Sequence, residues 1–567
     1  MVLIRIMRIT GAEAVIRALI DAGADTIFGY PGGAIMPVYD ALYGYREKIR
    51  HILVRHEQGA AHAAEGYARM TGRPGVCMAT SGPGATNLVT GIADAMLDSV
   101  PIVAVTGQVA GKLLGTDAFQ ETDVISVTIP LTKWNFQITE AREIAGVVAK
   151  AFYIASSGRP GPVLIDVTRN AQTEMVEYHY EPVTYLDTVK VVTQPKAEDL
   201  EQAAALINGA HKPYLLVGHG VSVSGAEKEV VELAEKAGIP VASTLLGLSS
   251  FPVAHPLYTG MLGMHGNYGP NMLSNNADVV IAVGMRFDDR VTMNLAGYLA
   301  KSKLIHIEID PAEIDKNVKV AVPIVADAKE ALRELLKLVQ KNSHTEWLEE
   351  FRRLNQVEEE KIIKPGSHPQ GGKLRMIEAV TQLSEKTQGK AVIVSDVGQH
   401  QMMSARYYKF AETNSYVTSG GLGTMGFGLP AAIGCKVGAP SRQVIVIVGD
   451  GSFQMTLQEL GTIMQEQLPI KIMLLNNSYL GMVRQWQEMF FEGRYSFTGM
   501  ANPDFIKICE SFGIEALRVQ DRSELGAGID KMLAAEKAFL LEVVVDMEEN
   551  VFPMVPAGHS ITDIRLE

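Results

Sequence analysis

Short runs of apolar, often β-branched residues recur along almost the whole 567-residue chain, and stretches with helical spacing separate them. The runs are continuous rather than alternating, which indicates strands that are buried on both faces. Strands of this kind alternate with helices in parallel sheets covered on both sides. The predicted fold class is therefore α/β, doubly wound several times over. The runs include HILVR, GVCMAT, PIVAVTG, GPVLIDV, PYLLVG, VVIAVG, LIHIEID, AVIVSD, VIVIVGD, IKIMLLNN and FLLEVVVD.

Two stretches interrupt this alternation. Residues 176–199 are polar and contain Pro182 and Pro195, and residues 340–373 combine a charged helix with the sequence KPGSHPQGGK. Proline, glycine and charge of this kind are typical of linkers. Since the chain is also too long for one hydrophobic core, we expect three doubly wound parallel-sheet domains at residues 1–180, 190–345 and 370–567.

The charge and the cysteine content exclude several classes of partner. The formal net charge is −13 and no long basic run is present, whereas a nucleic acid needs a cationic surface. The three cysteines are widely spaced, which fits a reducing compartment rather than a disulfide framework. We therefore expect no nucleic-acid partner and no cysteine metal cluster.

The start of the chain predicts an amphipathic helix rather than a signal peptide, with Ala14, Val15, Ala18 and Leu19 on one face. No apolar run reaches membrane-spanning length. We expect a cytoplasmic protein with no membrane partner, although an organelle protein already trimmed of its transit peptide would look the same.

Polar clusters follow two of the apolar runs near the C-terminus. Gly449-Asp450-Gly451-Ser452 follows the run at 444–448, and Asn476-Asn477 follows the run at 470–475. In an open parallel sheet, ligands bind outside the carboxyl ends of the strands. Both clusters are therefore expected at one ligand-binding edge.

The chemistry of these clusters suits a metal-bound phosphate. Glycine lets the backbone approach a phosphate closely, and Asp450 and Asn477 offer the hard oxygen ligands that Mg²⁺ prefers. A helix between the two clusters would direct its N-terminus at the same anion. The apolar face predicted for that helix contains Leu457, Leu460, Ile463 and Met464.

A GDG turn alone is an ordinary turn, and an Asn pair alone is an ordinary strand cap. Together, with one helix between them, they resemble the thiamine-diphosphate motif. In that family the second Asn and the backbone carbonyl two residues later complete the protein ligands of the metal. The resemblance implies thiamine diphosphate and Mg²⁺ as cofactors, with Asp450, Asn477 and Tyr479 as the metal ligands.

Thiamine diphosphate also needs an acid near its aminopyrimidine, and Glu57 is the candidate. The sequence predicts a strand that ends at Arg55 and a helix from Glu57 to Gly72. Alone, Glu57 is more simply a first-turn residue favoured by the helix dipole. Beside TSGPGATN at residues 80–87, the block resembles the pyrimidine-binding domain of thiamine-diphosphate enzymes, in which the Glu shifts the ring towards its imino form.

Further blocks, spread over nearly the whole chain, resemble the catalytic subunit of acetolactate synthase (acetohydroxyacid synthase). The resemblance implies decarboxylation of pyruvate on thiamine diphosphate and condensation with a second pyruvate or with 2-oxobutyrate. The products would be 2-acetolactate or 2-aceto-2-hydroxybutyrate, on the route to valine, leucine and isoleucine. The blocks include FGYPGGAIMPVYDAL, GTDAFQE, GMRFDDRVT, DVGQHQM, SGGLGTMGFGLPAAIG and LNNSYLGMVRQWQ.

The same resemblance implies roles in substrate handling. Arg290 would hold the carboxylate of the acceptor, since a guanidinium forks onto a planar carboxylate. Trp486 would favour 2-oxobutyrate through its extra methyl group, a contact worth about 1–3 kcal/mol. Met264 would contact flavin and substrate, and Phe119 and Gln120 would lie near the reacting carbon. Outside the family, Arg290 would be interpreted as a surface residue and Trp486 as a core residue.

The family also binds FAD without net redox chemistry. Gly218-His219-Gly220 is not a full dinucleotide fingerprint, because Val223 stands where a third glycine would be. The sequence RFDDR, with Arg286 as the flavin contact, is the better indication. The cofactor contacts that the resemblance implies, with Met425 packed against thiamine diphosphate and Met455 between its rings, are Val397, Gln399, His400, Gly423, Met425, Gly449, Gly451, Ser452, Met455, Gly481, Met482, Arg286, Gly218, Gly220, Asp310 and Asp327.

The chain departs from the family after GPV, where D-[IL]-P-K-D-V is usual. Here the sequence is DVTRNAQ, with Thr168 and Arg169. Arginine keeps the charge of the lysine but has a different head-group geometry. Arg169 is therefore not assigned a catalytic role.

In this superfamily Glu57 of one chain would face Asp450 of another, so a homodimer or homotetramer is expected. The expected substrates are pyruvate and 2-oxobutyrate, and a small regulatory subunit is a possible partner. Pyruvate oxidase, which shares the architecture and FAD, is the main alternative. Glyoxylate carboligase lacks the activating Glu, and an inactive nucleotide-binding or scaffold protein would not need Glu57, Asp450 and Asn477.

Overall fold

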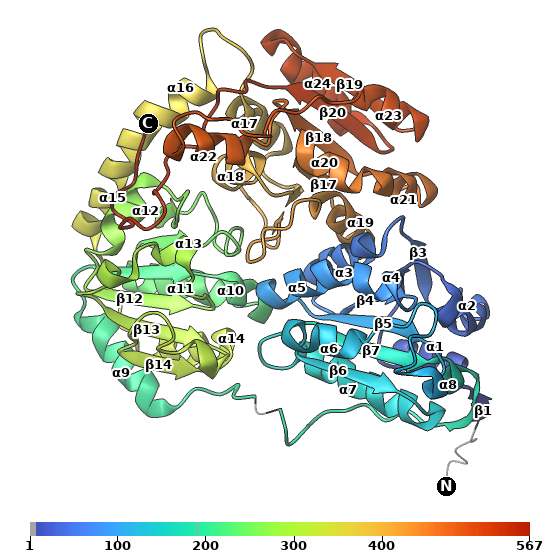
Figure 1. Cartoon of the computed structure of the whole chain (residues 1–567). Coiled ribbons are helices and arrows are strands. Elements are labelled where there is room, and N and C mark those ends of the chain that lie inside the picture. Colours follow the sequence, from blue (N-terminus) through green and yellow to red (C-terminus); the bar gives the residue numbers. More distant parts are fainter. Residues whose placement is uncertain (1–6, 190) are drawn as a thin grey trace.

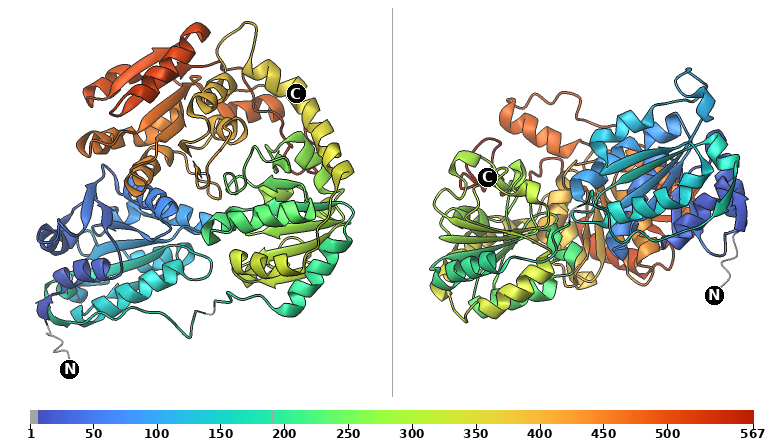
Figure 2. Two further views of the ribbon diagram at one scale, coloured as in Figure 1. Left: turned by 180° about the vertical axis from the view of Figure 1, so that it is seen from behind. Right: turned by 90° about the horizontal axis from the view of Figure 1, so that it is seen from below.

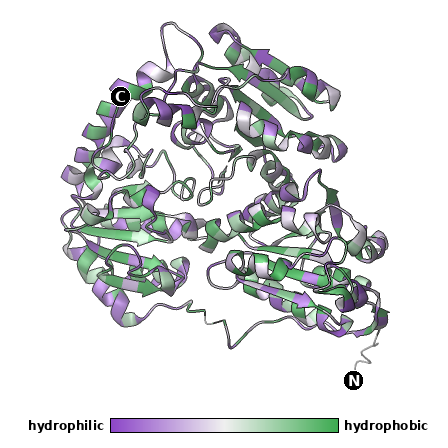
Figure 3. Cartoon of the chain, viewed as in Figure 1, coloured by the Kyte–Doolittle hydropathy of each residue, from purple (hydrophilic) through white to green (hydrophobic). Residues whose placement is uncertain are grey.

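The computed structural model describes residues 7–189 and 191–567. Its regular structure is dominated by three six-stranded parallel sheets, each covered by helices on both faces (Figures 1 and 2). In Figure 3 the strands of the sheets are largely apolar, and the polar residues gather on the outer sides of the helices. The predicted fold class, α/β with three doubly wound parallel sheets, is confirmed. We call the three units the first, second and third lobes in chain order; the predicted domain boundaries stay a prediction.

The first lobe has the strand order β3-β2-β4-β5-β7-β6. Its strands are Arg50–Leu53, Thr26–Gly29, Gly75–Ala79, Ile102–Gln108, Val163–Thr168 and Trp134–Ile138. Helices α3 (Glu57–Thr71) and α5 (Val89–Asp98) cover one face, and α1 (Gly11–Asp21), α2 (Met36–Tyr43) and α7 (Ile144–Ser156) cover the other. The predicted N-terminal helix is confirmed as α1, with its apolar side buried.

The second lobe has the order β11-β10-β9-β12-β13-β14. Its strands are Tyr258–Met261, Val241–Ser243, Pro213–Val217, Val279–Val283, Lys303–Glu308 and Val322–Val325. One face carries α9 (Ala197–Gly209), α11 (Glu227–Ala237) and α14 (Ala328–Leu338), and the other carries α12 (Tyr268–Ser274) and α15 (Thr345–Glu358).

The third lobe has the order β16-β15-β17-β18-β20-β19. Its strands are Tyr416–Val417, Val392–Ser395, Val444–Gly449, Lys471–Asn476, Phe539–Val544 and Glu515–Val519. One face carries α19 (Gly428–Gly438), α21 (Leu460–Gln465) and α23 (Phe505–Ser511), and the other carries α17 (Met376–Thr387), α18 (Gln399–Tyr407) and α24 (Arg522–Ala534).

Both predicted linkers contain more regular structure than expected. Residues 176–178 belong to β8 (Met175–Tyr178), which pairs antiparallel with β1 (Met7–Thr10), so the linker prediction is wrong there. The strand escaped detection because four residues are too few to establish a period. The second stretch continues from α15 through a π-helical turn, Glu359–Ile363, into α16 (Lys364–Ser367).

The prediction of a single helix after the GDG turn is also wrong. The chain forms α20 (Asp450–Thr456), a 3₁₀ turn at Leu457–Glu459 and then α21, and Met464 is exposed. The break turns Glu459 inward, where its Oε1 accepts hydrogen bonds from the backbone N–H groups of Arg55 and His56. This long-range contact overrides the local helical period.

In the described part of the chain, no helix combines the length and the apolar character needed to cross a membrane.

Helices α3 and α19 join the first and third lobes almost backbone to backbone. A Cβ atom on Gly434 would lie 1.8 Å from the carbonyl oxygen of Ala63, and one on Gly66 would lie 2.0 Å from that of Ala431. The surrounding apolar residues of both lobes form one continuous buried cluster. Neither glycine can be replaced without separating the helices.

The first prediction concerns this contact. Gly434→Ala should lower the free energy of unfolding by about 1–3 kcal/mol, because the added methyl group overpacks the interface. Gly146→Ala is the matched control, since Gly146 is exposed in α7 and a Cβ atom there would have no neighbour within 4 Å; it should stabilise by about 0.5–1 kcal/mol. Urea unfolding followed by circular dichroism measures both, and equal stability of the two variants would contradict the packing argument.

Candidate active site

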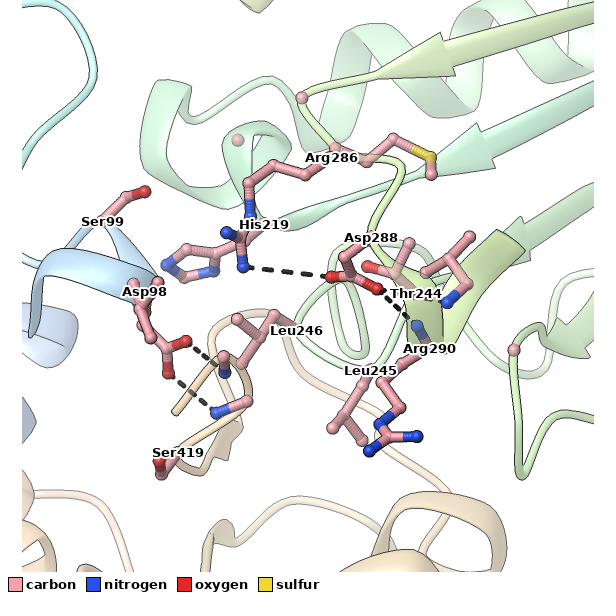
Figure 4. Close-up of a pocket in the computed structure, with 18 of the residues that line it drawn as sticks. Asp98, Ser99, His219, Thr244, Leu245, Leu246, Arg286, Asp288, Arg290 and Ser419 are labelled. Carbon is pink, nitrogen blue, oxygen red and sulfur yellow. Dashed lines mark hydrogen bonds and ion pairs between the residues drawn. The ribbon is translucent and has the colours of Figure 1, made fainter. Parts of the chain in front are cut away.

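A cavity of about 970 Å³, here called the large cavity, lies where the three lobes meet. Each lobe contributes to its walls: the end of α5 from the first, the segments that follow β9, β10, β12, β13 and β14 from the second, and residues 419–425 and α22 (Gly481–Phe490) from the third. Figure 4 shows side chains from all three converging on it. Its volume is at the upper end for a small-molecule site.

A second, smaller cavity of about 50 Å³ adjoins the large one. The predicted metal residues Asp450, Asn477 and Tyr479 line it. Predicted cofactor contacts that line it are Gln399, His400, Gly449, Gly451, Ser452 and Gly481, while Val397, Met425 and Met482 line both cavities. The structure therefore brings these sequence-predicted residues together at the carboxyl ends of β17 and β18.

The chemistry of the small cavity fits a divalent cation. Asp450 is 1% exposed, and burial raises its pKa to about 6. Its Oδ2 accepts a hydrogen bond of 2.6 Å from Asn502 Nδ2, and Asn477 Oδ1 accepts one of 3.1 Å from the backbone N–H of Tyr479. A buried carboxylate beside an amide oxygen is a donor set that a hard cation satisfies.

Asn502 is a site residue that sequence reasoning missed. Its Nδ2 also donates to Asn476 Oδ1 at 2.9 Å, so one amide links the two polar clusters at the strand ends. No local pattern in the sequence shows this role, because the two partners of Asn502 lie 26 and 52 positions away in the chain.

The backbone of the small cavity is shaped for close approach. A Cβ atom on Gly449 would lie 2.8 Å from His400 Nδ1, and one on Gly481 would lie 2.1 Å from Gln399 Oε1. Burial lowers the pKa of His400 to about 3, so its ring is neutral, and its buried Nε2 has no hydrogen-bond partner among the described residues. These features fit a diphosphate held against backbone and neutral side chains.

Arg290 reaches into the large cavity from α13 (Asp289–Thr292), as Figure 4 shows. The carboxylate of Asp288 caps this helix by accepting hydrogen bonds of 3.1 Å from the backbone N–H groups of Arg290 and Val291. The guanidinium Nη1 lies 3.7 Å from Met264 Sδ, and the side chain is 57% exposed. The guanidinium is thus oriented by its backbone but open to an anion.

Trp486 lines the large cavity from α22, as predicted for a substrate contact. Its ring packs edge-on against Phe490, with 6.0 Å between ring centroids. Its buried Nε1 has no partner within the described residues. Trp486 and Arg290 therefore line the same cavity.

The glycine-rich loop at 419–425 is held by a carboxylate that sequence reasoning also missed. Asp98, at the end of α5, accepts hydrogen bonds from the backbone N–H groups of Gly420 (2.9 Å) and Gly421 (2.6 Å), as drawn in Figure 4. Arg69 Nη2 donates to the same carboxylate at 2.7 Å. No local pattern in the sequence shows a contact between Asp98 and residues more than 300 positions away.

Glu57, Phe119 and Gln120 form a separate group in the first lobe. Glu57 begins α3, as predicted, and its Oε2 accepts a hydrogen bond of 2.9 Å from Asn87 Nδ2. The backbone of Gln120 crowds Gly82, and Phe119 is 88% exposed. Among the described residues, none of the three lines either cavity of its own chain.

The remaining predicted cofactor contacts divide into two sets. Gly220, Arg286 and Asp327 line the large cavity, as do Met264 and Gly423. Gly218, Asp310 and Met455 line neither cavity in the described part of the chain.

Two of these outlying residues have structural contacts instead. A Cβ atom on Gly218 would lie 2.3 Å from the carbonyl oxygen of Gly284, so this glycine permits strand-end packing. Asp310 caps a 3₁₀ turn and lies 3.5 Å from Arg159. Glu308, at the end of β13, does line the large cavity, and burial raises its pKa to about 7.

Three family matches cover most of the chain. Residues 9–127, 200–335 and 396–543 match the N-terminal TPP binding domain, the central domain and the C-terminal TPP binding domain of thiamine pyrophosphate enzymes.

Curated relatives match over nearly the full length. The chain is 47% identical to "Acetolactate synthase large subunit" of Corynebacterium glutamicum, with 98% of this chain and 90% of the relative covered. It is 45% identical to "Acetolactate synthase isozyme 2 large subunit" of Escherichia coli (98% and 99% covered) and to "Acetolactate synthase 1, chloroplastic" of Nicotiana tabacum (98% and 85% covered).

The second prediction follows from the raised pKa of Asp450. A cation needs the deprotonated carboxylate, so Mg²⁺ affinity in the presence of thiamine diphosphate should fall as the pH drops below about 6. The loss should be about tenfold per pH unit. Calorimetric titration between pH 5 and 8 measures it. Asp450→Asn should bind weakly at every pH, whereas Asp530→Asn, at an exposed site on α24, should behave as the wild type; a flat profile in the wild type would contradict the assignment.

Proposed function

The chain belongs to the acetolactate synthase family of thiamine-diphosphate enzymes, and from this membership we propose that it condenses pyruvate, after loss of CO₂, with a second pyruvate or with 2-oxobutyrate. The observation that carries the proposal is the pair of adjoining cavities. One is lined by the predicted metal residues and the other by Arg290 and Trp486. Cofactor activation and acceptor recognition would thus occur side by side.

When bound, thiamine diphosphate supplies the electron sink that lets a 2-oxo acid lose CO₂ and pass on its two-carbon unit. Glu57 would exchange a proton with the aminopyrimidine. Its Oε2 is engaged by Asn87, which leaves Oε1, next to Gly84, for that role.

The acceptor would be held by charge and by shape. Arg290 would bind the carboxylate of the 2-oxo acid, and its partial exposure supports access by an anion. Trp486 would contact the alkyl end, and Met264 lies beside the guanidinium. An acceptor with one more methyl group would gain apolar contact without losing the ion pair.

We propose Mg²⁺ and FAD as the further cofactors. Asp450, Asn477 and the backbone carbonyl of Tyr479 would hold the Mg²⁺. The large cavity would take FAD, with Arg286, Gly220 and Asp327 in its walls. The buried Glu308 at the end of β13 is an additional candidate for a ribose hydroxyl, since an acid at a strand end is typical of such contacts.

We propose a homodimer as the smallest active unit. Glu57 and Asp450 belong to separate sites within one chain, and this separation supports a cofactor bound between the first lobe of one copy and the third lobe of another. The name "large subunit" carried by several relatives supports a smaller regulatory partner. A cytoplasmic location is part of the same proposal.

The alternatives are less well supported. Pyruvate oxidase, the main alternative from the sequence, is not favoured by the full-length relatives. Glyoxylate carboligase remains disfavoured by the presence of Glu57 at the start of α3.

The third prediction tests the function directly. The protein incubated with pyruvate, Mg²⁺, thiamine diphosphate and FAD should form 2-acetolactate, identified by mass spectrometry. Glu57→Gln should lose at least about 99% of this activity with the fold retained, because an amide cannot exchange the proton. Glu198→Gln, at an exposed first-turn Glu of α9, is the matched control. Acetyl phosphate or peroxide as the product would overturn the proposal.

The fourth prediction concerns acceptor choice. With equal pyruvate and 2-oxobutyrate, Trp486→Leu should reduce the ratio of 2-aceto-2-hydroxybutyrate to 2-acetolactate by about tenfold, since one methyl contact is worth about 1–3 kcal/mol. Met489→Leu, on the same helix but outside the walls of the large cavity, should leave the ratio unchanged. An unaltered ratio in Trp486→Leu removes the specificity role.

A further inference from the structure

A buried ion pair connects the second and third lobes close to the acceptor site. Arg406, in the last turn of α18, donates through Nη2 to Glu358 Oε1 at the end of α15. The two side chains are 0% and 1% exposed. Removing two charges from water costs several kcal/mol per ion, so a gain in stability is a weak explanation for such a pair.

The pair forms hydrogen bonds with four successive residues of one turn. Arg406 Nη1 donates to the backbone carbonyls of His265 (2.7 Å) and Gly266 (2.8 Å). Glu358 accepts hydrogen bonds from Asn267 Nδ2 (2.9 Å) and from the backbone N–H of Tyr268 (2.6 Å). The turn 265–268 is therefore held by one cation and one anion that come from two other elements.

This turn is continuous with the wall that contains Arg290. Met264, which immediately precedes it, donates its backbone N–H to the carbonyl of Arg290 at 2.8 Å, and its Sδ lies 3.7 Å from Arg290 Nη1. Gly263 packs so closely that a Cβ atom there would lie 2.7 Å from the same Arg290 carbonyl. A displacement of the turn therefore displaces Arg290.

We propose that Arg406 and Glu358 are a positioning pair for the acceptor subsite. They fix Met264 and, through it, the guanidinium of Arg290, and so set the affinity for the carboxylate of a 2-oxo acid. Neither residue lines either cavity in the described part of the chain, so neither is catalytic. The identity of the acceptor rests on the proposed function, whereas the contacts that link the pair to Arg290 do not depend on it.

The test compares substrate affinity with cofactor affinity in the holoenzyme. Glu358→Gln keeps the shape of the side chain but replaces one acceptor oxygen with an NH₂ group that faces donors. We expect the KM for the acceptor acid and the calorimetric Kd for oxamate, a non-reacting 2-oxo acid analogue, to rise at least fivefold. The kcat and the Kd for thiamine diphosphate with Mg²⁺ should stay within twofold.

Two further variants sharpen the comparison. Arg406→Lys keeps the charge, but one ammonium group cannot span two carbonyls and a carboxylate, so we expect an intermediate rise. Glu229→Gln is the matched control, because Glu229 is buried in the second lobe, pairs with Arg333 at 3.0 Å and lies outside both cavities; its oxamate affinity should equal that of the wild type.

If Glu358→Gln fails to fold, the double variant Arg406→Met with Glu358→Met replaces the test, since removal of both charges leaves no unpaired ion. It should fold and still bind oxamate at least fivefold more weakly. Wild-type oxamate affinity in either folded variant, or an equal loss of cofactor affinity, overturns the positioning role. A wild-type protein that forms no acetolactate overturns the proposed function instead, and the oxamate comparison then still decides the role of the pair.

Discussion

The backbone-to-backbone contact of α3 with α19 is the constraint on which the rest of the arrangement depends. It fuses the apolar cores of the first and third lobes through glycines at positions where no side chain fits. The same two helices place the functional ends of their lobes, since Glu57 starts α3 and the glycine-rich loop leads into α19. The relative position of these two functional ends thus depends on a packing contact between glycine-containing helices.

Buried carboxylates make the second type of connection, and two of them accept hydrogen bonds from backbone N–H groups of a neighbouring lobe. Glu459 of the third lobe holds Arg55 and His56 of the first, and Asp98 of the first holds Gly420 and Gly421 of the third. Within the second lobe, Glu358 likewise accepts a hydrogen bond from the backbone N–H of Tyr268, and its ion pair with Arg406 reaches the third lobe. Charge-assisted bonds to backbone fix a loop without depending on the side chains it carries.

The sequence allowed the fold class and most strand positions to be predicted, because buried parallel strands are continuous apolar runs with little dependence on distant contacts. It also predicted that Asp450 and Asn477 lie at one edge, since the carboxyl ends of adjacent strands must meet, whereas Tyr479 came from the family resemblance; all three line the small cavity. It could not reveal Asp98, Asn502 or Arg406, whose partners lie far away in the chain or carry no local pattern. The prediction of one continuous helix after Asp450 was wrong for the same reason, because Glu459 makes a hydrogen bond to another lobe.

The large cavity has walls from all three lobes, whereas residues 179–189 and 191–196, in the connection between the first and second lobes, form no helix or strand. A ligand that fills the cavity therefore touches every lobe at once, and its binding free energy adds to the cohesion of the whole chain by mass action. Such a molecule would contribute to the stability of the fold even if it took no part in the reaction.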